Sequence, residues 1–160
     1  MLKGALGLAD AVVAELYFAS GALDAPQAAA SGQEHAEPTS HYSEEFFDLA
    51  MPLLEQLARV HHPGITHRLV ETLAHLAEHD PKRVLLAVHH AVAPGHGYQY
   101  ESLAVDLIVG LMQRYLVDYR HLVTNDEDAL TTFRELIEVF VRAGWPSAIT
   151  LAYQLPDAFR

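Results

Sequence analysis

The chain has 160 residues, of which 51% are hydrophobic and 19% are charged, so we expect one globular domain with a sizeable core. Its formal net charge is −11 at pH 7 and it has only ten Lys and Arg residues, which argues against nucleic acid as a partner. It has no cysteine, which excludes disulfides, thiolate nucleophiles and cysteine-ligated zinc, and which fits a cytoplasmic protein.

The first residues resemble a signal peptide only superficially. Lys3 precedes an apolar run, but Asp10 and Glu15 interrupt it, and a translocated hydrophobic region tolerates such charges poorly. The longest uncharged run in the most apolar segment, residues 107–113, is far shorter than the roughly 20 residues that span a bilayer. We therefore expect a soluble protein without a membrane partner.

The N-terminal part divides into a helix and a linker. Residues 1–21 are predicted to contain a helix, because Leu8, Val12 and Leu16 recur at a spacing of four. Residues 22–41 have no sustained period, contain Pro26, Gly32 and Pro38, and carry no large apolar residue after Leu23 that could anchor a helix. This segment is predicted to be a flexible linker.

Residues 42–160 are predicted to form a helical array, with short connections and no pattern typical of strands. Asp80-Pro81 is a strong start signal, with Asp as N-cap and proline at the first helical position. Pro52 is expected to kink or divide its helix. The expected helices span 44–61, 65–79, 82–93, 98–119, 126–143 and 146–155. Paired in this order, they predict an all-α protein, built either as a HEAT-like α-solenoid segment or as an irregular helical bundle.

The segment 98–119 is expected to be the structural centre of this array. Leu103, Leu107 and Leu111 form one row at a spacing of four, and further apolar rows flank it, so that more than half of the helix surface is apolar. Such a helix is expected to be packed on several sides, between the helices that precede and follow it.

One helical face carries a candidate metal site. His67, Glu71, His75 and His79 follow one another at a spacing of four, which places them on one side of a helix. Pairs of histidines at this spacing bind zinc or another divalent metal in some helical sites, but a further ligand must come from elsewhere. The alternative is a solvated polar face without a cofactor, since leucines occupy the other side of this helix.

Three aromatic residues beside loops are candidate contacts for a partner: Tyr98, Tyr100 and Trp145. Each could equally belong to the core. No serine lies in a nucleophile elbow, and no motif supports an active site at His96 and Glu101, so we expect no catalytic residues.

Three stretches, read together, resemble a known class of proteins. They are LYFASGA at 16–22, RYLVDYR at 114–120 and AGWPSA at 143–148. In this order they are similar to the helical C-terminal regions of very large bacterial multidomain proteins, including ATPases of the defence type. The resemblance implies a terminal module whose catalytic domain lies elsewhere.

Two functions are therefore expected from the sequence. The first is a non-catalytic α-helical scaffold that binds a protein partner or itself, and that forms a terminal piece of a larger bacterial protein. The alternative is a metal-binding helical protein that uses the histidine and glutamate face.

Overall fold

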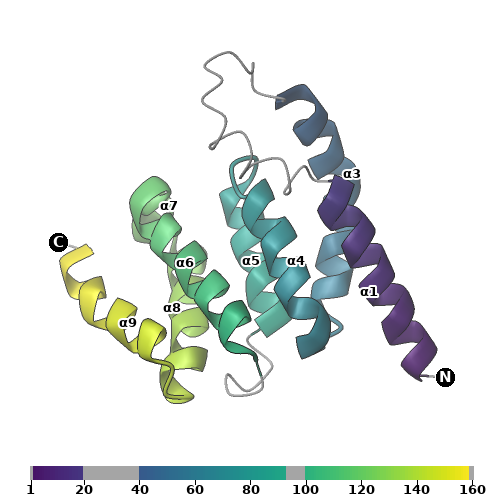
Figure 1. The fold of residues 1–160 in the computed structure, drawn as a ribbon. Coiled ribbons are helices and arrows are strands. Elements are labelled where there is room, and N and C mark those ends of the chain that lie inside the picture. Colours follow the sequence, from purple (N-terminus) through teal and green to yellow (C-terminus); the bar gives the residue numbers. More distant parts are fainter. Residues whose placement is uncertain (1, 20–39, 93–99, 159–160) are drawn as a thin grey trace, which may run out of the picture.

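The computed structural model describes residues 2–19, 40–92 and 100–158. In this part of the chain all regular structure is helical, which confirms the all-α fold class (Figure 1). The helices are α1 (Leu2–Ala19), α3 (Ser40–Ala58), α4 (Pro63–Leu76), α5 (Pro81–Val92), α6 (Ser102–Asp118), α7 (Arg120–Asn125), α8 (Glu127–Arg142) and α9 (Pro146–Ala158). Most of the expected linker lies outside the described residues, and α3 begins at Ser40, slightly before the expected start of the array.

The helices form two layers that alternate along the chain (Figure 1). One layer holds α1, α4, α6 and α9, because α4 contacts both α1 and α6, and α6 contacts α9. The other layer holds α3, α5 and α8, with α5 between its two neighbours. Contacts of α4 with α3 and α5, and of α8 with α6 and α9, join the layers. The core therefore lies between the two layers of helices, and α3 and α8 are the two ends of the second layer.

The pairing of consecutive helices agrees with expectation in two cases out of three. α3 packs against α4 and α8 against α9, but α5 and α6 approach each other less closely than expected. Tyr115 of α6 is fully buried, and its hydroxyl donates to the carbonyl oxygen of Pro81 in α5 at 2.6 Å. The close neighbours of α6 are α4 and α9 instead.

Side-chain caps define two of the helix starts. The backbone N–H of Arg83 donates to Oδ1 of Asp80 at 2.9 Å, which confirms the start signal at Asp80-Pro81. The N–H of Ala129 donates to Oδ1 of Asp126 at 3.0 Å, so Asp126 caps α8. Thr124 donates to the carbonyl oxygen of Arg120 within α7.

Pro52 neither kinks α3 strongly enough to divide it nor starts a second helix. α3 continues from Ser40 to Ala58 with Pro52 inside it. The proline lies on the exposed side of the helix, where water can solvate the carbonyl that loses its helical donor.

The central helix α6 is packed on several sides, as expected, but it also has a face toward solvent. Leu103, which was assigned to its apolar surface, is 68% exposed, and Val117 is 78% exposed. Asp106 and Gln113 lie on the same side and are exposed as well. The reason is the layered architecture, because a helix within a layer keeps one side free of neighbours. None of the helices in the described ranges combines the length and apolarity that crossing a membrane requires.

Candidate functional site

The polar face of α4 meets α1 along the outer side of the first layer. His67 and Glu71 are half-buried, and Nε2 of His67 lies 3.9 Å from Oε2 of Glu71. The hydroxyl of Tyr17, from α1, donates to Oε1 of Glu71 at 3.2 Å. Beside them, Arg68 of α4 forms an ion pair with Asp10 of α1 at 3.5 Å. This contact between two helices brings Tyr17 to a residue 54 positions later, and no local sequence signal points to it.

The protonation state of Tyr17 suits its hydrogen bond to Glu71. Burial, followed by the negative charge of Glu71, raises the pKa of the Tyr17 hydroxyl above its ordinary value. Tyr17 therefore stays a neutral donor to the carboxylate and does not become a phenolate ligand. One carboxylate oxygen of Glu71 is occupied by this bond, and the other faces His67.

His79 does not share the face of the other candidate ligands. α4 ends at Leu76, and a turn follows in which the N–H of His79 donates to the carbonyl of Leu76. The turn directs the imidazole against the ring of Phe47 in α3, with ring centroids 5.5 Å apart. A spacing of four places residues on one face only while the helix continues, so the helical prediction fails at this position.

The structure thus divides the four-residue set. His67 and Glu71 contact each other, His75 is half-buried on α4, and His79 packs between α3 and the end of α4. Within the described ranges, no three His, Asp or Glu side chains converge closely enough to hold a metal ion. A metal at this face would have His67 and Glu71 as its protein ligands and would have to displace the hydrogen bond from Tyr17.

Arg114 of α6 makes polar contacts with several residues, including one in α4. Its guanidinium donates to the carbonyl oxygen of Ala74 at 3.0 Å, to the hydroxyl of Tyr119 at 3.3 Å and to Asp118 at 3.3 Å. The pair with Asp118 lies within α6 at a spacing of four, whereas the bond to Ala74 joins α6 to α4. These contacts assign Arg114 a structural role between neighbouring helices of one layer.

The candidate aromatic contacts have different environments. Tyr98 lies outside the described residues. Tyr100 is only 3% exposed, donates to the carbonyls of Ala91 and Val92, and packs edge-on against Phe140. Trp145 is half-buried against the core, directly after Gly144, whose φ of 80° favours glycine. Tyr100 is therefore part of the interhelical core in this structure.

The adjacent histidine pairs near the ends of α3 and α5 have separate roles. Nδ1 of His62 accepts from the N–H of Gly64 and caps α4. Nε2 of His89 lies 2.7 Å from Oε2 of Glu135, which links α5 to α8. Burial, reinforced by the neighbouring His89 and Arg59, lowers the pKa of His90 below its ordinary value. His90 is therefore neutral at pH 7, whereas His62 caps a helix and His89 joins two helices.

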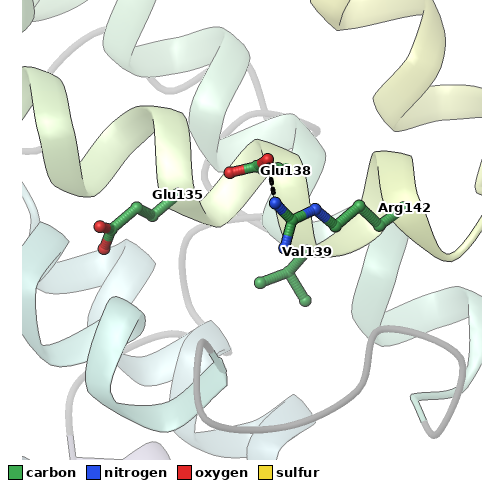
Figure 2. Close-up of a pocket in the computed structure, with 4 residues that line it drawn as sticks. All are labelled: Glu135, Glu138, Val139 and Arg142. Atoms are coloured by element: carbon green, nitrogen blue, oxygen red, sulfur yellow. Dashed lines mark hydrogen bonds and ion pairs between the residues drawn. The ribbon is translucent and has the colours of Figure 1, made fainter.

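A hollow on the outer side of α8 is the remaining surface feature. Figure 2 shows its lining by Glu135, Glu138, Val139 and Arg142, with an ion pair between Glu138 and Arg142. All four of these residues belong to α8. Both carboxylates already have partners, because Glu138 pairs with Arg142 and Glu135 lies beside His89 of α5, so the hollow is a polar helix surface.

We found no match to the chain among protein-family models, curated proteins or solved structures.

Proposed function

We propose that the chain is a non-catalytic α-helical scaffold that binds another protein. The observation that carries this proposal is the amount of large hydrophobic side chain on its described surface. Eight such residues are exposed, at 42–82% of their surface: Leu8, Phe18, Leu49, Leu53, Val60, Leu103, Val117 and Tyr153. Exposed apolar side chains on adjacent elements are a feature of surfaces that bind proteins.

The two-layer alternation of helices supports the same proposal. Arrays of this kind present long faces on which the side chains of successive helices stand next to one another, as in HEAT-like α-solenoids. The polar clusters of this chain serve helix contacts, and its charge of −11 suits a protein surface better than phosphate. In line with the sequence resemblance, we propose that the module is a terminal piece of a larger bacterial protein.

Metal binding at His67 and Glu71 is the alternative proposal. Its support is the 3.9 Å approach of the two side chains on one accessible helix face. The arrangement favours the scaffold, since His79 packs against Phe47 and the hydroxyl of Tyr17 occupies one oxygen of Glu71.

Site-specific photo-crosslinking tests the scaffold function. A benzophenone amino acid would replace Leu103, Val117 or Tyr153 in cells that naturally make the protein, with exposed Thr131 of α8 as the control position. We expect one discrete crosslinked protein at an apolar position and none at Thr131, and we expect the purified partner to bind the whole chain. Equal background crosslinking at every position would refute the proposal.

A further inference from the structure

The two ends of the second layer differ in the chemistry of their outer surfaces. Among the described helices, α8 has α5 as its neighbour within the layer and also contacts the short α7. Every exposed residue of α8 is polar or charged: Glu127, Asp128, Thr131, Arg134, Glu135, Glu138 and Arg142. A polar outer face is what the last helix of a stacked array requires in water. α8 therefore has the outer surface expected of a terminal, capping helix of the array.

α3 occupies the corresponding position at the other end but lacks such a surface. It also has only α5 beside it within the layer. Leu49 is 82% exposed and Leu53 42% exposed, and Pro52 between them is exposed too. Their spacing places all three on the side of the helix that its neighbours α1, α4 and α5 leave exposed. This side therefore exposes apolar side chains at positions where a terminal helix would carry polar ones.

The charges around these residues are almost all negative. Glu44, Glu45 and Asp48 are exposed in the first half of the described α3 surface, next to Leu49 and Leu53. Glu55 is held by Arg83 of α5, with Nε to Oε1 at 2.6 Å, and Arg59 is the exposed cation after the end of the helix. An apolar row beside three exposed carboxylates attracts a partner that is apolar on one face and basic on its flank.

From this contrast we infer that the outer face of α3, defined by Leu49, Pro52, Leu53 and the flanking Glu44, Glu45 and Asp48, binds a basic amphipathic helix of a partner protein. In the described part of the chain no helix occupies the position beyond α3 in its layer, which is where the next helix of the layer would pack. A second copy of the chain fits poorly, because it has 21 acidic and ten basic residues and would bring like charge to this face. The inference rests on the proposed scaffold function and identifies one surface and one partner chemistry for it.

The test uses the full chain and a fluorescein-labelled helical peptide of about 18 residues, composed of leucine, alanine and lysine, with the leucines on one face. The control peptide carries glutamate in place of every lysine. Because the face is small, we expect anisotropy titrations carried to about millimolar protein to give weak but saturable binding of the basic peptide, with a Kd above the micromolar range, and no binding of the acidic peptide. Binding should weaken when NaCl is raised from about 0.05 M to about 0.5 M, because salt screens exposed charges.

Paired protein variants locate the binding site. Leu49→Ser with Leu53→Ser should weaken peptide binding at least tenfold, and Glu45→Gln with Asp48→Asn should weaken it severalfold. The matched control is Leu103→Ser with Val117→Ser on α6, where two apolar side chains of similar exposure are removed. This control should bind like the unmodified chain, and circular dichroism should give native helicity for all three variants.

Two results would overturn the inference. One is equal affinity of the α3 and α6 variants for the peptide, and the other is absence of binding by the unmodified chain. Neither result would refute the scaffold function, since photo-crosslinking at Leu103, Val117 and Tyr153 tests that function independently of α3.

Discussion

Replacing Tyr115 by phenylalanine tests how the two layers are held together. The ring of Tyr115 is fully buried between α5 and α6, and its hydroxyl donates to the carbonyl of Pro81 at 2.6 Å. Phenylalanine keeps the ring and removes only this bond. One buried hydrogen bond contributes about 1 kcal/mol net, and the Pro81 carbonyl keeps the helical donor that its place in the first turn of α5 provides.

We therefore expect Tyr115→Phe to lower the free energy of unfolding by about 1 kcal/mol. For a domain of this size that corresponds to a fall in Tm of about 2–4 °C. Urea titrations followed by circular dichroism at 222 nm would measure the first quantity, and thermal melts the second. Tyr153→Phe is the matched control, because that tyrosine is 82% exposed on α9 and the substitution removes a hydroxyl that faces solvent.

The pH dependence gives this prediction a second readout. Burial raises the pKa of Tyr115 well above its ordinary value of 10.0. Above about pH 10 the unfolded chain ionises this hydroxyl while the folded chain does not, so the folded state loses stability as pH rises. Phenylalanine lacks this titration, and the stability difference between the two proteins should therefore shrink between about pH 9 and pH 11. Equal stability of the two proteins at pH 7, or an equal loss in Tyr153→Phe, would refute the reasoning.

Three further predictions concern the helix ends and the histidines. Asp126→Ala should lower the urea midpoint at pH 7, because Asp126 caps α8 and pairs with Lys82 at 2.6 Å. These bonds lower the pKa of the Asp126 carboxyl, so the stability difference between the two proteins should disappear in acid, where this carboxyl is protonated in both the folded and the unfolded state. His79→Ala should lower the free energy of unfolding by about 1–2 kcal/mol, because the imidazole packs against Phe47, whereas His75→Ala should change it by no more than about 0.5 kcal/mol. One equivalent of zinc should leave the Tm of the unmodified chain unchanged, and a rise in Tm with zinc would favour the metal site. Solubility should fall between about pH 7.5 and 5.5, since protonation of 11 histidines would move the formal charge from −11 toward 0.

Local signals in the sequence were enough to predict most helices. The caps and prolines act within one turn of chain, so the start of α5 at Pro81 and the start of α9 at Pro146 follow from the residues themselves. α8 could be predicted because its apolar residues fall on one side, as the end of a layer requires. The short α7 was not predicted, because its six residues are too few to show a period.

The neighbours of each helix could not be predicted in the same way. Leu103 has the same local pattern as Leu111, yet the first is 68% exposed and the second 4% exposed. The difference arises because α4 and α9 take the two sides of α6, and such contacts depend on the whole array. The bond from Tyr17 to Glu71 and the break at His79 depend likewise on which helices meet and on where α4 ends.

The size of the apolar surface on α3 limits how tightly this face alone can bind a partner. Full burial of a leucine contributes about 1.5–3 kcal/mol, so covering the exposed parts of Leu49 and Leu53 contributes about 2–4 kcal/mol in total. Ion pairs with exposed carboxylates add less than about 1 kcal/mol each. Micromolar affinity requires about 8 kcal/mol after the cost of association, which is more than this face supplies. A tight partner must therefore also contact the neighbouring helix α1, where Leu8 and Phe18 are exposed, or bind through several modules at once.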